Sequence, residues 1–386
     1  SDESAPLLQA TPSWEINMVP LGVATCSVVW FPCLQLLFMN IAPLHFAPSP
    51  KPVTLHLALQ GGGAHGAFTW GALECLLDEP DIQIGRISGT SAGALNGAAL
   101  VSGYARGGRS GAKSNLALLW QKASEAGSLM SLFHLPLMKP SMGIWDDAMP
   151  LLSPYQTNPL ALELLRYLVT TITDVELMRA ATGPSLFVNA VNVHTGQARV
   201  FGPGDMTVAA VMASACAPLM FPAVIIDGQS YWDGSYAGNP SIWPLYDGQD
   251  EADIFMVELT PLHRVETPTT AKNILNRINE IASVNGLRSE LRGVQQVNQA
   301  GKDIRLHVLS FAESVADAQA EPSTKRTVGP VLFETLRRQG YEACAQWLVL
   351  NRGSLGRCAT VDIGQRYLAA DRSVDVKTIG ARAASA

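Results

Sequence analysis

Two glycine-rich turns constrain the fold of this chain more than any other feature, because each links a short apolar run to a helical segment. The first turn, Gly61–Gly66, follows the run Val53–Leu59, and the second, Gly89–Gly93, follows the run Ile84–Ser88. A strand–turn–helix order that repeats in this way is typical of a largely parallel sheet covered by helices. The periodicity and the small residues after each turn predict helices at Ala67–Leu77 and Ala92–Ser102.

The same alternation continues toward the C-terminus. Further strands are expected at Ser185–Val191, Ala198–Phe201, Ala223–Ile226, Ile254–Leu259 and Ile304–Ser310. One or two amphipathic helices are expected over Thr270–Gln299, and another helix at Val331–Leu350. We therefore predict a three-layer α/β/α sandwich with a central, mostly parallel sheet. This domain is expected over residues 53–352, between an apolar N-terminal extension (1–52) and a loose C-terminal tail (353–386).

The composition excludes several classes of protein. Of the 386 residues, 47% are hydrophobic and 16% are charged, and this apolar content argues against a disordered chain. The net charge is −6 and there is no long basic run, so nucleic acid is not an expected partner. The six cysteines form no C-x-x-C pair, and His45, His56, His134 and His194 have no ligand spacing, so no metal site is predicted.

Much of the apolar content lies before the predicted domain. Ile16–Pro50 contains no Asp, Glu, Lys or Arg, and its densest part, Leu21–Met39, would span roughly 28 Å as a helix, which approaches a bilayer core. Prolines interrupt this run, and acidic residues before it argue against a secretory signal. Three interpretations stay open: a strap or lid packed on the domain, a membrane anchor, or the remnant of a targeting segment.

The second turn reads Gly-Thr-Ser-Ala-Gly, which is a G-x-S-x-G sequence between an expected strand and an expected helix. Such a sharp turn needs glycine at positions 89 and 93, because larger side chains would clash with the neighbouring backbone. It presents the Ser91 hydroxyl at the edge of the sheet, with a helix N-terminus behind it. Ser91 is therefore the candidate nucleophile.

The first turn reads Gly-Gly-Gly-Ala-His-Gly, and its backbone N–H groups can point at an anion. Gly61, Gly63 and Gly66 also fit the G-x-G-x-x-G pattern of a dinucleotide site, which requires an acidic residue at the end of the next strand. The acidic residues at 78, 79 and 81 precede that strand instead. The alternative use is an oxyanion hole for an ester carbonyl, which the nearby G-x-S-x-G sequence favours.

A third motif, Tyr231–Ser235, contains Asp233 and Gly234 and by itself is typical of a turn. The three motifs in this order resemble the patatin-like phospholipase family, whose patterns are G-G-G-x-[RK]-G, G-x-S-x-G and D-G-[GA]. Ala213–Pro218, followed by Phe221 and Pro222, is similar to the A-S-x-A-x-P-x-x-F-P segment that precedes the aspartate in that family. The resemblance covers roughly residues 53–260.

The resemblance implies a serine acyl hydrolase of the phospholipase, lipase or esterase type, with a lipid or ester substrate and no cofactor. Ser91 would be the nucleophile and Asp233 the base that takes its proton. Water would then cleave the acyl-enzyme. The oxyanion hole would be formed by Gly61, Gly62 and Gly63, with Gly62 and Gly63 as donors and Gly61 shaping the loop. The remaining glycines of the motifs, Gly66, Gly89, Gly93 and Gly234, would support these residues.

Two positions depart from the family pattern. His65 stands where the family has Arg or Lys, which leaves simpler esters and glycerides open beside phospholipids, because a neutral imidazole suits a lipid phosphate less well than a permanent cation. The other reading of His65 is a partly exposed residue at a helix start that tolerates the exchange. Ser235 replaces the usual Gly or Ala, and we expect little consequence from so small a residue.

Several interpretations remain open at this point. A Ser-His-Asp triad of the α/β-hydrolase type could use His263 or His307, and a non-catalytic lipid-binding or nucleotide-binding module could use the glycine loop. The methionine-rich segment Leu129–Tyr155 is either an ordinary loop or an adaptable acyl-chain pocket. The expected location is the cytoplasm or a membrane surface, with peripheral membrane contact, and the oligomeric state is left open.

Overall fold

The computed structural model describes residues 52–133, 153–157, 160–264, 266–315 and 329–369. The N-terminal stretch Ile16–Pro50 and most of the segment Leu129–Tyr155 lie outside these residues, so the interpretations of both stay predictions. No helix in the described part of the chain is both long enough and apolar enough to cross a bilayer.

One eight-stranded sheet forms the centre of the domain, with the strand order β5-β6-β3-β2-β1-β7-β8 and with β4 paired to β3. The parallel strands are β1 (Val53–Leu59), β2 (Ile82–Gly89), β3 (Ser185–Asn192), β7 (Glu251–Glu258) and β8 (Asp303–Ser310). The antiparallel strands at one edge are β4 (Ala198–Phe201), β5 (Val224–Ile226) and β6 (Gln229–Asp233). This order confirms the predicted, mostly parallel sheet.

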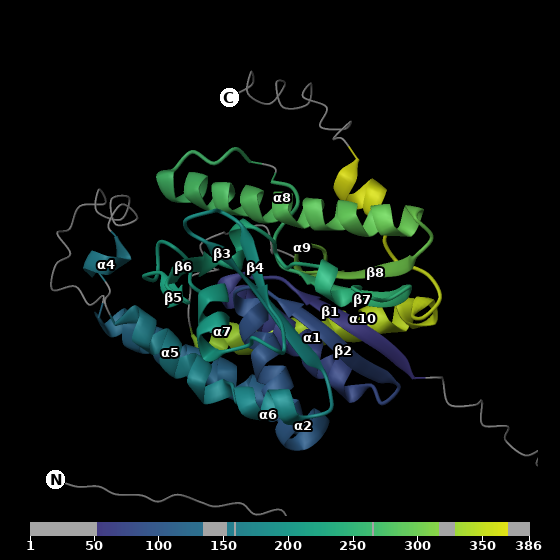
Figure 1. Cartoon of the computed structure of the whole chain (residues 1–386), viewed down its shortest axis with the longest axis horizontal. Helices are drawn as coiled ribbons and strands as arrows, with labels where there is room; N and C mark the ends of the chain where they lie inside the picture. The colour runs from purple at the N-terminus through teal and green to yellow at the C-terminus, as the bar shows by residue number, and fades with distance from the viewer. Residues whose placement is uncertain (1–51, 134–152, 158–159, 265, 316–328, 370–386) are drawn as a thin grey trace, which may run out of the picture. The chain divides into compact units, whose positions relative to one another are not determined.

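Helices cover both faces of the sheet (Figure 1). One face carries α1 (Gly66–Asp78), α2 (Ala92–Phe133), α5 (Ala161–Ile172), α6 (Val175–Ala180), α7 (Val208–Ser214) and α10 (Pro330–Asn351). The other face carries the long helix α8 (Ala271–Gln299). The remaining short elements are η1 (Gly63–His65), α4 (Pro154–Thr157), η3 (Gly234–Tyr236), η4 (Trp243–Leu245), α9 (Phe311–Ser314), η6 (Arg352–Ser354) and η7 (Gly364–Leu368).

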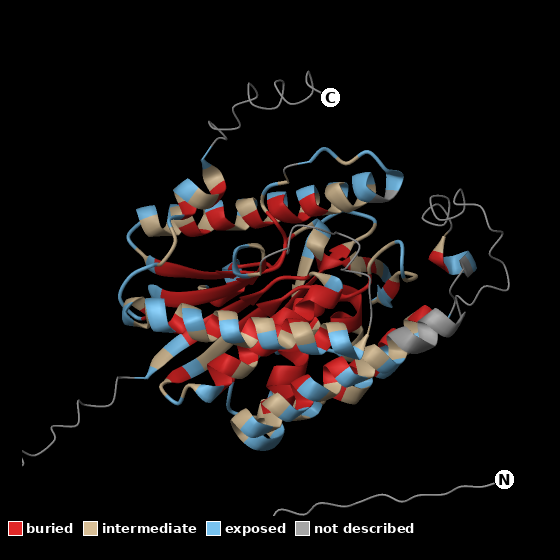
Figure 2. Ribbon diagram, turned by 180° about the vertical axis from the view of Figure 1, so that it is seen from behind, coloured by how far each residue is buried: buried red, intermediate tan, exposed pale blue. Residues whose placement is uncertain are grey.

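The strand β7 illustrates why the sheet is buried on both faces. Its side chains alternate, so Phe255 and Val257 join the core beneath α1, α2 and α10, whereas Ile254 and Met256 join the core beneath α8. The burial of the strands is evident in Figure 2, where the sheet is red between the helical layers. An unbroken apolar strand of this kind is typical of a parallel sheet with helices on both sides.

One expected helix differs in extent from the structure, and for another the structure decides between one helix and two. The helix predicted at Ala92–Ser102 continues to Phe133, with a break at Gly107 and Gly108, and the φ of Gly108 is +60°. Helix α8 is a single helix, and the Thr270 side chain caps its N-terminus by accepting a hydrogen bond from the Asn273 N–H.

The loose tail predicted from residue 353 onward differs from the structure as far as residue 369. Leu355, Ile363 and Tyr367 are buried against the domain. The Tyr367 hydroxyl donates to Glu258 at 2.7 Å, and Arg366 pairs with the same carboxylate at 2.7 Å. The segment was predicted to be loose because most of its residues are small or polar, and its composition does not reveal the three apolar side chains that pack against the domain.

The strand register brings the three sequence motifs to the same edge of the sheet. Leu59 of β1 pairs with Gly89 of β2, so the glycine loop and the G-x-S-x-G turn both begin where these parallel strands end. Asp233 ends β6 opposite Ala190 of β3, and β3 itself pairs with β2. Ligand sites of open parallel sheets lie beyond the carboxyl ends of the strands, and this edge holds the candidate site.

Candidate active site

The turn between β2 and α2 places Ser91 in a left-handed backbone conformation, with a φ of +55°. This conformation is unusual for a residue that has a Cβ atom, and it turns the serine out of the line of the strand. The Ser91 N–H is held by Ser214, whose backbone oxygen accepts at 3.1 Å and whose Oγ accepts at 3.2 Å. The similarity of Ala213–Pro218 to a family segment thus has a physical basis, because this segment fixes the turn.

Close backbone contacts require both glycines of the turn. A Cβ atom on Gly89 would lie 2.5 Å from the Gly93 oxygen, and one on Gly93 would lie 2.1 Å from the Leu59 oxygen. Each separation is far below van der Waals contact, so alanine at either position would push the turn away from the end of β1. The sequence-based reason for these glycines is confirmed.

Asp233 lies at the end of β6 and is almost completely buried, with 4% of its surface exposed. Burial raises the pKa of its carboxyl group, while hydrogen bonds from the Ser235 and Ser91 hydroxyls and from the Ser235 N–H oppose that rise. The backbone N–H of Asp233 donates to the Cys216 oxygen at 2.9 Å. The segment that fixes Ser91 therefore also fixes Asp233, and the two side chains line the same cavity, close enough for the Ser91 hydroxyl to lower the pKa of the carboxyl group.

The glycine loop lies against the serine. A Cβ atom on Gly61 would lie 2.7 Å from the Ser91 Cβ, so only glycine allows this approach. The Gly61 N–H donates to Asn239 Oδ1 at 2.6 Å, whereas no acceptor in the described part of the chain takes the N–H of Gly62 or Gly63. The Gly61 N–H is thus occupied, and the oxyanion-hole roles of Gly62 and Gly63 stay predictions.

Two buried asparagines that the sequence analysis missed hold these elements together. Asn239 binds both sides of the Gly61 peptide unit, since its Nδ2 also donates to the Gly61 oxygen at 3.3 Å and to Ser283 Oγ at 2.7 Å. Asn189 accepts from the Thr90 hydroxyl and donates to the Gly238 oxygen at 2.8 Å. Neither residue belongs to a motif, so their roles follow only from the packing of distant segments.

Replacing Asn239 with alanine should lower kcat on the order of 100-fold while KM changes little, because the released Gly61 peptide no longer fixes the neighbouring N–H groups. Steady-state hydrolysis of a soluble ester measures both constants. Asn351→Ala is the matched control, since its side chain bonds only within α10, to the Trp347 oxygen. An Asn239→Ala protein that keeps its kcat would contradict this positioning role.

A cavity of about 380 Å³ opens beside Ser91, Asp233 and Gly61–Gly63, which all line it. One side of the cavity is apolar and is lined by Leu95, Leu119, Trp120, Leu165, Leu168 and Phe333. The side toward α8 is polar and is lined by Thr260, Asn276, Asn279, Glu280 and Ser283. The candidate nucleophile and the buried carboxylate thus lie between an apolar and a polar wall.

The histidines that were candidates for a catalytic or binding role do not line this cavity. Among the described residues that line it there is no histidine. His65 is not the partly exposed residue of one sequence reading, because only 4% of its surface is exposed and its ring packs on Phe311 with centroids 4.7 Å apart. His263 is exposed in the loop after β7. The described chain also has no cluster of His, Cys, Asp or Glu that could hold a metal ion.

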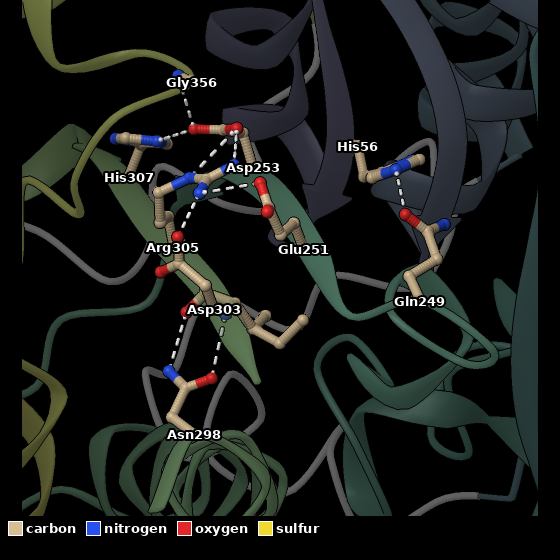
Figure 3. A network of polar contacts seen from close by, with 10 residues as sticks. His56, Gln249, Glu251, Asp253, Asn298, Asp303, Arg305, His307 and Gly356 are labelled. Carbon is tan, nitrogen blue, oxygen red and sulfur yellow. Dashed lines mark hydrogen bonds and ion pairs between the residues drawn. The ribbon is translucent and has the colours of Figure 1, made fainter. Parts of the chain in front are cut away.

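His307 belongs to a structural network between β7 and β8 (Figure 3). Its Nε2 lies 2.9 Å from Asp253 Oδ1, and the guanidinium of Arg305 reaches Asp253 Oδ2 at 2.8 Å. The Gly356 N–H donates to the same carboxylate at 3.0 Å and ties the C-terminal segment to the sheet. Burial alone would raise the pKa of Asp253, but these partners outweigh it and hold the pKa at about 2.

The Asp253 network should make stability depend on pH in the acid range. Because the pKa in the folded state is below the ordinary value of 3.8, the stabilisation is complete above about pH 4 and is lost as the pH falls through 2. Asp253→Asn should lower the free energy of unfolding at pH 7 by about 3 kcal/mol, because the buried Arg305 guanidinium loses its buried charge partner and keeps ion pairs with exposed carboxylates alone. Urea unfolding at pH 7 and pH 3 measures both effects, and an unchanged midpoint at pH 7 would contradict them.

The fold and the site now define a class. A serine in a left-handed turn between a parallel strand and a helix, at the carboxyl edge of the sheet, has the geometry of a nucleophile elbow. A family model described as patatin-like phospholipase matches residues 57–246, which include all four motifs. The chain therefore contains a patatin-like phospholipase domain, and the resemblance inferred from the motifs is confirmed.

Solved structures give more distant likenesses. VipD from Legionella pneumophila is 14% identical, with a TM-score of 0.35, and the match covers 82% of this chain and 73% of VipD. The type III effector ExoU is 17% identical, with a TM-score of 0.30 and coverage of 78% and 54%. The complex of ExoU with SpcU from Pseudomonas aeruginosa gives 17% identity, a TM-score of 0.30 and coverage of 86% and 60%. A comparison with curated protein sequences finds no significant match.

Proposed function

We propose that this protein is a serine acyl hydrolase that cleaves carboxylic esters of lipids, with Ser91 as the nucleophile and Asp233 as its base. The observation that carries the proposal is the placement of Ser91, in its left-handed turn, and the buried Asp233 carboxylate in the lining of one cavity with an apolar wall. Direct proton transfer between the two side chains needs no histidine relay, and burial makes the carboxylate a stronger base than an exposed aspartate. The family match supports the coarser class of lipid ester hydrolase.

The proposed reaction has two halves. In the first, the Ser91 oxygen attacks the ester carbonyl carbon while its proton moves to Asp233, and the N–H groups of Gly62 and Gly63 stabilise the oxyanion. The intermediate collapses when the bond to the alcohol oxygen breaks, and the alcohol leaves with the proton from Asp233. In the second half, a water molecule attacks the acyl carbon while its proton passes to Asp233. The bond between the acyl carbon and the Ser91 oxygen then breaks, Asp233 returns the proton to that oxygen, and the acid is released.

The two walls of the cavity support an orientation for the substrate. The apolar wall formed by α2, α5 and α10 suits an acyl chain, because burying each methylene group contributes about 0.8 kcal/mol. The polar wall formed by α8 and Thr260 suits the alcohol part of the ester, whose hydroxyl groups need hydrogen-bond partners when they leave water. The catalytic pair lies at the boundary between the walls, where a lipid ester bond lies between its acyl chain and its alcohol.

Hydrolysis of a substrate panel tests this proposal. The panel contains p-nitrophenyl esters of short and long acyl chains, a triglyceride emulsion and phospholipid vesicles, with Ser91→Ala protein as the blank. We expect turnover to rise with acyl length until the apolar side of the cavity is filled. A preference for the shortest soluble ester over every lipid would rule against a lipid acyl hydrolase, and turnover in the blank would rule against Ser91.

A further inference from the structure

The hydroxyl of Ser235 makes a short contact with the buried carboxylate of the site. Ser235 Oγ donates to Asp233 Oδ1 at 2.6 Å, and the Ser235 N–H donates to the same oxygen at 2.9 Å. Two donors from one residue thus hold one oxygen of the carboxylate. Ser235 makes no such bond to the other oxygen, Oδ2.

This contact differs from what the sequence predicted, because we expected little consequence from serine at this position. Glycine or alanine would keep the backbone N–H bond and lose the hydroxyl bond. A hydroxyl that donates to a carboxylate makes a charge-assisted bond, which is shorter and stronger than a bond between neutral groups. The extra bond is therefore a feature of this chain beyond the D-G-[GA] pattern.

We propose that Ser235 is a positioning residue for the hydrolysis, and that its hydroxyl fixes the rotation of the Asp233 carboxylate and stabilises its ionised form. The inference rests on the proposed function, since it assigns Asp233 the role of base. A fixed carboxylate keeps one oxygen directed at Ser91 through repeated turnovers, which shortens the search for the reactive geometry. A stabilised ionised form keeps the base ready for proton transfer at lower pH.

The groups around Asp233 that can stabilise its ionised form are hydroxyl groups and not charged side chains. The Cys216 thiol, in the loop after α7, faces Asp233. Burial and the Asp233 charge raise the pKa of this thiol to about 12, so the thiol is neutral. From α8, Glu280 lines the same cavity and is paired with Arg264 and Arg277. In the part of the chain that the structure describes, no cationic side chain opposes the rise that burial causes in the pKa of Asp233. The hydroxyl groups of Ser235 and Ser91 oppose this rise instead.

The position of Ser235 also connects the base to the glycine loop. A Cβ atom placed on Gly61 would lie 3.2 Å from Ser235 Oγ, so the hydroxyl occupies the space between the carboxylate and the loop. Ser235 lines the cavity as well. Removing the hydroxyl would open room beside Oδ1, where the carboxylate could rotate or bind a water molecule.

The test compares Ser235→Ala with Ser235→Thr, which keeps a hydroxyl donor, and with Ser230→Ala, a serine on the same strand three residues before Asp233. The readout is the pH dependence of covalent labelling by a fluorophosphonate probe, which needs no knowledge of the substrate. We expect the acid limb of the Ser235→Ala profile to move up on the order of one pH unit. Its plateau rate should fall severalfold, while Ser235→Thr and Ser230→Ala stay close to the wild-type profile.

The outcomes separate this inference from the proposed function. An acid limb that does not move in Ser235→Ala, while wild-type protein is labelled at Ser91, would overturn the role of Ser235 alone. An equal shift in Ser235→Thr would also overturn it, because the donor is retained there. Absence of labelling in wild-type protein would overturn the proposed function instead. Thermal unfolding verifies that each variant is folded, and Ser235→Gly replaces Ser235→Ala if the alanine variant does not fold.

Discussion

Ester hydrolysis should fall by at least about 1,000-fold when Ser91 is replaced with alanine, because the variant cannot form the acyl-enzyme. Labelling by a fluorophosphonate should disappear completely, since the probe reacts only with an activated nucleophile. The turn itself should persist, because the Ser91 N–H bond to Ser214 and the two flanking glycines do not depend on the hydroxyl. Hydrolysis of a p-nitrophenyl ester and mass spectrometry of the labelled peptide measure the two effects.

A matched control and a contrary outcome complete this prediction. Ser230→Ala removes a hydroxyl from β6, outside the cavity lining, and should keep wild-type labelling and turnover. If the Ser91→Ala protein were still labelled, the probe would be reacting at another residue and the nucleophile assigned here would be wrong. If wild-type protein were not labelled at all, a non-catalytic binding module using the glycine loop would become the better explanation.

The sequence was sufficient to predict the sheet because the strands of a doubly covered sheet are continuous apolar runs. Val53–Leu59 and Ala198–Phe201 agree with the structure at both ends, and the other expected strands agree to within a few residues. The strand that carries Asp233 was missed, because the run Gln229–Asp233 is short and polar and lies in an edge hairpin. Asp233 was identified from its Asp-Gly motif, because the strand that carries it has no apolar periodicity that would predict it.

Other features depend on contacts between distant segments and left no local signal. Gly71 and Gly340 are an example: a Cβ on the first would lie 1.8 Å from the Arg337 oxygen, and one on the second 1.9 Å from the Phe68 oxygen. These glycines let α1 and α10 cross in close contact. Asn239 is similar, because its partners Gly61 and Ser283 are distant in sequence. A single sequence shows such residues only as ordinary glycines and asparagines.

The exchange at position 65 acquires a different meaning in the structure. From the sequence alone, one interpretation of His65 is a weaker substitute for a cation that binds a lipid phosphate. The side chain is instead buried beside Phe311 and does not line the cavity, so it is not placed to contact a substrate there. We therefore expect the preference for phospholipid or neutral ester to depend on the polar wall along α8, which lies beyond residues 57–246, the range that the family model matches.

Replacing Asp233 with asparagine should lower kcat by about 100-fold to 10,000-fold, because the amide has nearly the same shape but cannot accept the Ser91 proton. Burial raises the pKa of Asp233 above 3.8, so wild-type turnover should fall as the pH decreases through that raised value, when the carboxylate becomes protonated. The variant should show no such acid limb. Steady-state kinetics of a soluble ester over a range of acid and neutral pH measures both effects.

The controls for Asp233→Asn decide between a dyad and a triad. Asp227→Asn makes the same chemical change in an exposed turn, where Arg199 is the ion-pair partner of the carboxylate among the described residues, and it should leave turnover unchanged. His263→Ala and His307→Ala should keep kcat per folded molecule, although His307→Ala should lower the unfolding midpoint because it breaks the bond to Asp253. Loss of turnover in a folded histidine variant would support a Ser-His-Asp triad. Retention of turnover in both, together with its loss in Asp233→Asn, requires that Ser91 transfer its proton directly to the carboxylate.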